Sequence, residues 1–130
     1  MGAKPPSAVV LDAGALVAFE RGEERIRALL RHAVATRARV VVPSGVLGQV
    51  WRGGARQVAL RALVASSICE TPPLDRVMAQ AAGALCGRAG TSDLIDASVV
   101  LTARRERAPV LTADVDDLRR LDPTLTLVRV

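Results

Sequence analysis

The chain of 130 residues contains few aromatic side chains and few cysteines. Its aromatic residues are Phe19 and Trp51, too few rings to stack successive bases as single-strand binding proteins do. Cys69 and Cys86 form neither a CxxC pair nor a dense framework, so we interpret them as reduced thiols with a structural role. Redox chemistry and a disulfide scaffold are therefore disfavoured.

Long apolar runs are also missing. No stretch approaches the roughly 18 apolar residues that a membrane-spanning helix needs. The opening sequence MGAKPPSAVVLD lacks a basic segment followed by an apolar one and a small-residue cleavage site. We therefore expect a cytoplasmic protein with no membrane span.

The charged residues are unbalanced toward arginine. Lysine and arginine number 18 against 13 acids, giving a net charge of +5, and Lys4 is the only lysine. A basic surface favours a polyanionic partner such as nucleic acid, although arginine enrichment also follows from genome composition. Arg52, Arg56 and Arg104 are our candidates for binding an RNA backbone.

Short valine-rich runs alternate with helical patterns along the chain. We expect strands at 8–11, 39–42, 67–70, 109–112 and 126–130, and helices at 13–20, 23–37, 44–52, 56–65, 71–88, 92–107 and 115–121. Gly87 and Gly90 are expected to break the fifth of these helices. The pattern and a hydrophobic content of 50% predict one domain over residues 1–130, a three-layer α/β/α fold with a mainly parallel sheet.

Acidic residues occur where such a fold gathers functional side chains, at the carboxyl ends of strands. Asp12 directly follows the first strand, and Asp114 follows the fourth. Asp96 lies in TSDLIDASVV, a helix so apolar that we expect this carboxylate to be buried and to need a partner. The three acids together favour a hard cation, Mg²⁺ or Mn²⁺, which suits phosphodiester hydrolysis by an activated water.

Several of the acids in these segments could instead have a purely structural role. Asp12 could cap the following helix, and Asp93 could complement the dipole in the first turn of its helix. Asp116 and Asp117 could do the same in the helix after Asp114. Asp96 has the weakest explanation of this kind.

Four segments occur in the order VVLDAGALVAFERG, VPSGVLGQVWRGG, SDLIDASVV and VLTADVDDLRRL. Together they resemble the PIN-domain ribonucleases, and most closely the VapC-type toxins of bacterial toxin–antitoxin pairs. The resemblance implies a PIN-like α/β/α fold and a Mg²⁺-dependent endoribonuclease, the toxin of a type II toxin–antitoxin pair. It also implies an RNA substrate, a small cognate antitoxin and a homodimer.

The resemblance assigns roles to particular residues. The family acids fall on Asp12, Asp96 and Asp114 as metal ligands, with Asp117 as a further catalytic acid. Asp93 is close enough in sequence to Asp96 to assist.

One position departs from the family pattern. Where many members carry a glutamate, this chain has Gln49, which removes a negative charge and should weaken metal affinity. Glu20, two helical turns after Asp12, could compensate, or could simply be an exposed acid beside Arg21.

Two other classes of function compete with a nuclease. A PIN-like module poor in metal could bind RNA or an antitoxin with little cleavage, because Gln49 has depleted the site. A phosphoacceptor receiver or an aspartate phosphatase could also use a strand-end aspartate. A receiver is disfavoured because it needs a lysine at the end of a later strand, whereas Lys4 precedes the first strand. An aspartate phosphatase is disfavoured because its pattern needs a second aspartate at the position of Gly14.

Overall fold

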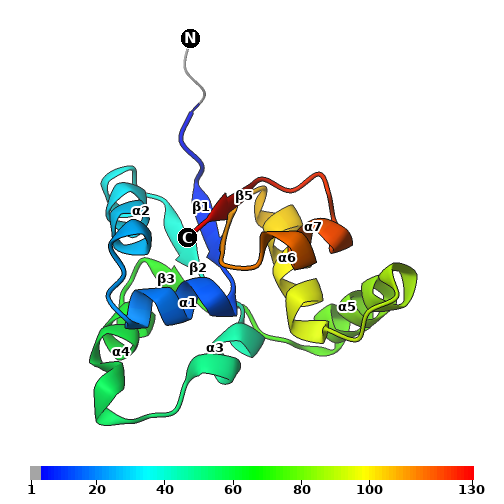
Figure 1. The fold of residues 1–130 in the computed structure, drawn as a ribbon, viewed down its shortest axis with the longest axis horizontal. Helices are drawn as coiled ribbons and strands as arrows, with labels where there is room; N and C mark the ends of the chain where they lie inside the picture. Colours follow the sequence, from blue (N-terminus) through cyan, green and yellow to red (C-terminus); the bar gives the residue numbers. More distant parts are fainter. Residues whose placement is uncertain (1–3) are drawn as a thin grey trace.

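The computed structural model describes residues 4–130, and these form a single parallel β-sheet flanked by helices (Figure 1). Five strands lie in the order β3-β2-β1-β4-β5, and every neighbouring pair is parallel. The strands are β1 (Ala8–Leu11), β2 (Arg39–Val41), β3 (Cys69–Glu70), β4 (Val110–Thr112) and β5 (Leu127–Arg129). The predicted fold class is confirmed.

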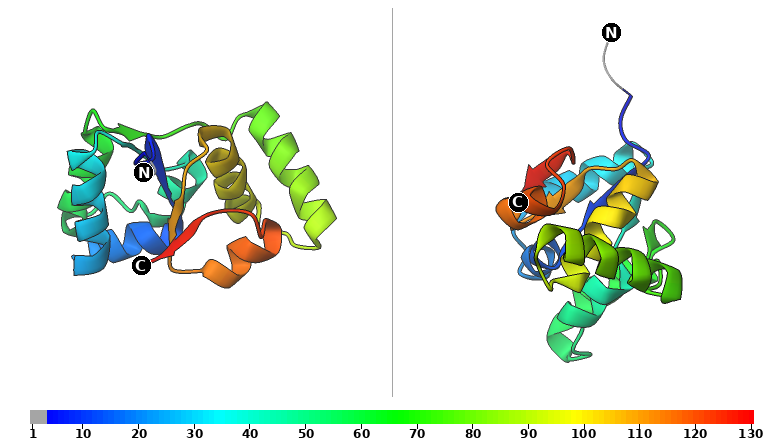
Figure 2. Two further views of the ribbon diagram at one scale, coloured as in Figure 1. Left: turned by 90° about the horizontal axis from the view of Figure 1, so that it is seen from above. Right: turned by 90° about the vertical axis from the view of Figure 1, so that its right-hand side faces the viewer.

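Helices cover both faces of the sheet (Figure 2). They are α1 (Ala13–Glu20), α2 (Glu24–Ala35), α3 (Ser44–Val50), a 3₁₀ turn η1 (Ala55–Gln57), α4 (Val58–Ala65), α5 (Arg76–Ala89), α6 (Leu94–Glu106) and α7 (Val115–Leu121). Helix α6 packs on β1, and α5 packs on the outer side of α6. Helices α1, α2 and α4 lie on the opposite side (Figure 1).

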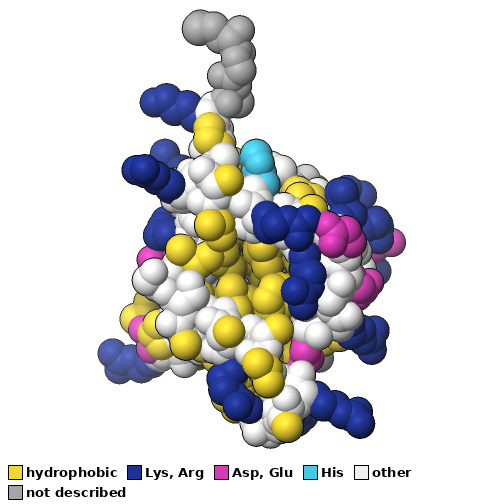
Figure 3. Space-filling model, turned by 90° about the vertical axis from the view of Figure 1, so that its left-hand side faces the viewer, with side chains coloured by type: hydrophobic (Ala, Val, Ile, Leu, Met, Phe, Trp, Pro, Cys, Tyr) yellow, Lys and Arg dark blue, Asp and Glu magenta, His cyan; other side chains and the backbone are white. Residues whose placement is uncertain are grey.

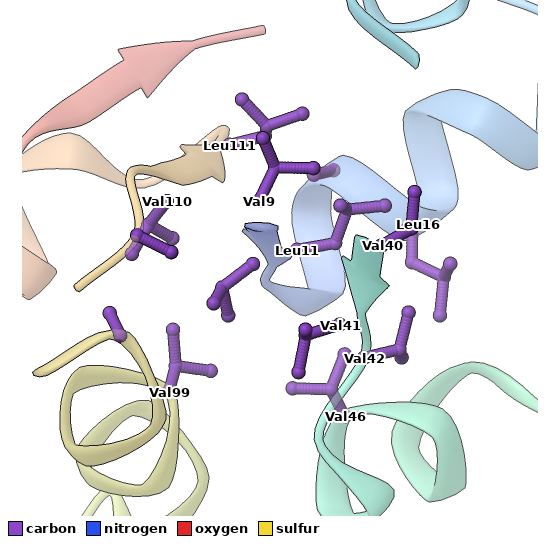
Figure 4. Packing of buried hydrophobic residues seen from close by; sticks show 14 of the residues in the cluster. Val9, Leu11, Leu16, Val40, Val41, Val42, Val46, Val99, Val110 and Leu111 are labelled. Carbon is purple, nitrogen blue, oxygen red and sulfur yellow. The ribbon is translucent and has the colours of Figure 1, made fainter. Parts of the chain in front are cut away.

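The core explains why the central strands are valine-rich. All four residues of β1 are buried, because side chains on alternate faces of the strand meet helices on both sides. Leu11 packs toward Leu16 of α1, whereas Val110 of β4 lies near Val99 of α6 (Figure 4). A strand covered on both faces shows a continuous apolar run and no alternation, as the sequence does here.

The strand order places a switch point between β1 and β4. From β1 the chain moves outward to β2 and β3, and it then returns to build β4 and β5 on the other side of β1. Adjacent connections therefore diverge at the carboxyl ends of β1 and β4, which leaves a crevice there in sheets of this type. Asp12 and Asp114 follow these two strands.

Two predicted helix boundaries were wrong. Helix α5 begins at Arg76 instead of residue 71, because Asp75 caps it by accepting a hydrogen bond from the N–H of Met78 at 2.9 Å. Gly87 lies inside α5, and only Gly90, with φ of 70°, ends the helix.

The remaining helices follow the predicted ranges to within a few residues at their ends. Within residues 4–130 no helix is both long enough and apolar enough to cross a bilayer.

Candidate active site

Asp12 lies at the exit of β1 and is only 3% exposed. Its Oδ1 accepts a hydrogen bond from the N–H of Ala15 at 2.8 Å, and its Oδ2 accepts one from the hydroxyl group of Thr112. Burial raises the pKa of Asp12, while these two bonds oppose that rise. The carboxylate therefore caps α1, as its structural explanation proposed, yet each oxygen keeps a lone pair for a further partner.

Asp114 lies at the exit of β4 and is exposed. Its backbone N–H donates a hydrogen bond of 2.7 Å to the Thr112 hydroxyl oxygen. Its pKa is raised, first by desolvation and then by the charges of Asp117 and Asp12. Asp12 and Asp114 are thus close enough to repel one another electrostatically.

Asp96 approaches the same place from α6. Its pKa is raised to about 7, first by burial and then by the charges of Asp93, Asp12 and Asp114. Four carboxylates from three parts of the sequence therefore share one electrostatic environment.

The expected setting of Asp96 and Asp93 needs correction. Asp96 is half-buried instead of fully buried, because it lies in the first turn of α6 with the buried face beginning at Ala97. Asp93 is the N-cap of α6 and does not lie in its first turn as expected, and its Oδ1 accepts a hydrogen bond from the N–H of Asp96 at 2.9 Å.

Two glycines allow the helices that carry these acids to approach closely. A Cβ at Gly14 of α1 would lie 2.6 Å from the Cβ of Ala113, between Thr112 and Asp114. A Cβ at Gly45 of α3 would lie 2.5 Å from Cδ1 of Ile95, next to Asp96. Both separations are below van der Waals contact. At Gly14 the neighbouring Cβ is fixed to the backbone, so a larger residue would displace α1, whereas at Gly45 the end of the flexible Ile95 side chain would have to move.

A cavity of about 200 Å³ opens beside Asp96. Its lining includes Asp93, Asp96 and Asp117, so the structure brings the predicted catalytic acid Asp117 to the other carboxylates. Arg120 of α7 also lines it. Sequence reasoning missed Arg120, although its position three residues after Asp117 places both on one helix face.

A second depression, of about 700 Å³, contains Gln49 and Glu20 together with Arg52 and Arg56. Glu20 and Gln49 thus line the same depression, and compensation by Glu20 for the missing glutamate stays a prediction. Neither residue lines the cavity that contains Asp96.

Arg104 is not brought to the carboxylates. It lies eight residues after Asp96 on α6, about 12 Å along the helix axis. Its Nε donates a hydrogen bond to Oδ2 of the buried Asp122 at 2.7 Å. Burial raises the pKa of Asp122, but bonds from Thr124 and Arg104 outweigh it and lower the pKa overall. Arg104 therefore has a structural ion pair.

The carboxylate set fits a hard divalent cation in charge and in donor chemistry. All its donors are oxygens, and the pKa values of Asp96 and Asp114 are raised first by burial and then by the neighbouring carboxylates. Among residues 4–130, however, no three carboxylate, thiol or imidazole groups are already arranged to hold an ion. Closing around a metal would require side-chain movement.

The chain matches a family model in sequence and several solved structures in fold. The family model for the PIN domain matches residues 9–122. A structure of VapBC2 from Rickettsia felis bound to a promoter DNA fragment aligns with a TM-score of 0.72. The identity is 17%, over 95% of this chain and 98% of that chain.

Two further structures align with a TM-score of 0.64. FitAB bound to an IR36 DNA fragment is 15% identical, over 93% of this chain and 94% of that chain. FitAcB from Neisseria gonorrhoeae is 16% identical, over 92% of this chain and 95% of that chain. At these identities the likeness is one of fold. No curated protein sequence matches the chain.

Proposed function

The chain belongs to the PIN domain family, and from this premise we propose that it is a metal-dependent endoribonuclease, the toxin of a type II toxin–antitoxin pair. PIN domains are generally nucleases. The observation that carries the proposal is that Asp93, Asp96 and Asp117 line one cavity, while Asp12 and Asp114 lie at the ends of the neighbouring strands β1 and β4. Carboxylates gathered in this way repel one another, and a bound cation relieves that repulsion.

Asp12, Asp96 and Asp114 would hold Mg²⁺, or Mn²⁺ in its place. The chemistry that such an ion supplies when bound is activation of a water molecule and neutralisation of charge developing on the phosphate. Asp12 is pre-positioned for this role because Thr112 and Ala15 hold its two oxygens. Asp93 and Asp117, at the cavity, would accept hydrogen bonds from water and orient it.

The RNA strand would extend from the carboxylates over the second depression. Arg52 and Arg56 lie in it, and their guanidinium groups suit contacts to phosphates. Gln49 in the same depression would hold water or an RNA hydroxyl by its amide. Arg104 is dropped from this RNA surface because Asp122 already pairs with it.

An apolar groove supports the antitoxin part of the proposal. Figure 3 shows the face formed by α2 and α4, where apolar side chains are framed by arginines. Phe19, Leu30, Val34 and Leu63 line a hollow of about 430 Å³ with Arg27 and Arg31. Val34 is 51% exposed, and the buried Nε of Arg27 has no hydrogen-bond partner among residues 4–130. The chemistry fits a peptide with apolar anchors and acidic side chains.

Copurification tests the groove. Val34→Asp should abolish copurification with the product of the adjacent reading frame, whereas Val77→Asp, on the 70% exposed Val77 of α5, should not. Equal copurification of both variants would remove the groove from the proposal.

We also propose that the protein is a homodimer. Light scattering of the purified protein measures its mass and tests this.

The nuclease itself is tested with purified protein and pooled RNA. Asp96→Asn should abolish Mg²⁺-dependent cleavage and preserve the fold, and chelation should stop the wild-type protein. Asp116→Asn is the matched control, because this exposed acid of α7 does not line the cavity. Cleavage by Asp96→Asn at the wild-type rate would show that the site is wrong.

A binding module with little cleavage is the second candidate. It is favoured by Gln49 and by the lack of a preformed three-ligand group within residues 4–130. Calorimetric titration separates the two, because a module would show no Mg²⁺ or Mn²⁺ binding while still binding RNA or antitoxin tightly.

A further inference from the structure

Within residues 4–130, Arg120 is the one cationic residue that lines the carboxylate cavity. It lies in α7, whose inner face is fixed by Leu118 and Leu121, 0% and 9% exposed. The backbone of Arg120 is therefore held, while the side chain itself is exposed. A positively charged group is thus anchored beside Asp93, Asp96 and Asp117.

The guanidinium group of Arg120 is not used in the fold. Among the ion pairs and side-chain hydrogen bonds within residues 4–130, none involves this side chain, although Asp117 lies on the same helix face. Arg39 shows the contrast, because it pairs with both Glu70 and Glu106. Arg120 has no comparable protein partner to give up when a ligand arrives.

A phosphodiester that approaches this cavity meets several carboxylates of its own sign. A cation at the cavity, in addition to the metal ion proposed above, opposes this repulsion more effectively than arginines elsewhere on the surface. A guanidinium group offers paired N–H donors that match two phosphate oxygens. We propose that Arg120 binds a phosphate group of the RNA substrate at the edge of the carboxylate cavity, an inference that rests on the proposed ribonuclease function.

Direct binding is the test, because it is independent of turnover. Asp96→Asn provides a background that does not consume RNA, and the probe is a fluorescently labelled single-stranded RNA of mixed sequence. In that background Arg120→Gln should weaken binding about tenfold, the loss expected for one charge-assisted hydrogen-bonded contact. The slope of log Kd against log salt should fall by about 0.7, as expected for one lost phosphate contact to a single strand.

The chain offers a matched control in Arg119, which is exposed on the same helix but does not line the cavity. Arg119→Gln removes the same charge and should change Kd less than about twofold. Arg120→Lys should keep the salt slope and recover only part of the affinity. Equal losses for Arg119→Gln and Arg120→Gln would overturn the proposal, since only overall charge would then matter.

A structural role for Arg120 would be to offset the charge of Asp117. In that case Arg120→Gln would have no effect on RNA binding once Asp117→Asn is present, and this result would also overturn the proposal. A phosphate contact predicts the same tenfold loss with or without Asp117. With Asp96 intact, Arg120→Gln should raise KM by a similar factor and leave kcat within about twofold.

The proposed function fails on different results. If Asp96→Asn still cleaves RNA, or if neither the wild type nor this background binds the probe, the ribonuclease assignment falls together with the role of Arg120. If Asp96→Asn is inactive and Arg120→Gln binds RNA normally, only the phosphate contact is wrong.

Discussion

The hydroxyl group of Thr112 donates a hydrogen bond to Oδ2 of Asp12, a residue that lies 100 positions earlier in the chain. The same hydroxyl oxygen accepts a hydrogen bond from the N–H of Asp114 at 2.7 Å. Thr112 is fully buried and ends β4. The Thr112 hydroxyl group therefore positions both the side chain of Asp12 and the backbone of Asp114.

Thr112→Val should remove this link without changing the volume greatly. The buried Asp12 would lose a donor, so its pKa should rise further and the fold should lose about 1–3 kcal/mol. Metal affinity should fall as well, because Asp12 would ionise less readily. Thermal unfolding and calorimetric metal titration measure the two effects. Thr112→Ser keeps the hydroxyl group and is the control, and equal metal affinity in both variants would contradict the role given to Thr112.

The link between Thr112 and Asp12 follows from strand pairing that the sequence does not state. In the parallel pair of β1 and β4, Leu11 lies opposite Leu111, so the next residues of the two strands meet. Local pattern predicted both strands well, because each is a short buried apolar run. It did not say which strands are neighbours, so Thr112 was missed while Asp12 was found.

Other differences have local causes. The Thr71-Pro72-Pro73 sequence suggested a helix start, but a residue before proline avoids helical backbone and Asp75 supplied a better cap. Asp96 looked fully buried because its helix is apolar, yet its position in the first turn leaves it beside the cavity. Arg104 was expected to bind RNA, but it pairs with Asp122. Asp122 is not a neighbour of Arg104 on α6, so spacing along the helix does not predict this ion pair.

Gly14→Ala should be costly although alanine favours helices. The added Cβ would lie 2.6 Å from Cβ of Ala113, which is attached to the backbone and cannot turn away. We expect a loss of about 1–3 kcal/mol by thermal or denaturant unfolding, and lower cleavage because α1 would move Asp12 away from Asp114. Gly83→Ala on α5 is the control, because within residues 4–130 the added Cβ would meet nothing within 4 Å beyond its chain neighbours and its own helix backbone, and it should stabilise by about 0.5–1 kcal/mol. A neutral Gly14→Ala would show that α1 adjusts freely.

Gln49→Glu should raise Mg²⁺ affinity. Gln49 lies one turn after Gly45, on the α3 face that packs against Ile95, the neighbour of Asp96. The new carboxylate would also meet Arg52 and Arg56 in its depression, so we expect a gain of only a few-fold. Calorimetry measures the gain, with Glu20→Gln as the test for compensation. Unchanged affinity would show that position 49 does not face the metal.

Stability in the absence of divalent ions should fall as pH rises through neutrality. The pKa of Asp96 is about 7 in the folded protein, against an ordinary value of 3.8. Between these values the folded protein keeps a proton that the unfolded chain has lost, so unfolding becomes easier with rising pH. Asp122, whose pKa is lowered, contributes the opposite trend at acid pH and is common to every variant compared. In EDTA, the melting temperature of the wild type should therefore decline between about pH 4 and 7 more steeply than that of Asp96→Asn.

Mg²⁺ should reverse this decline, because it binds the ionised carboxylates and only the folded protein gathers them. The gain in melting temperature should be larger at pH 8 than at pH 5. At pH 5 Asp96 is protonated, and the proton competes with the metal for the carboxylate. Asp96→Asn should lose most of the gain at both values, whereas Asp116→Asn should keep it. Parallel pH curves for the wild type and Asp96→Asn, with and without Mg²⁺, would mean that Asp96 neither carries the raised pKa nor binds the ion.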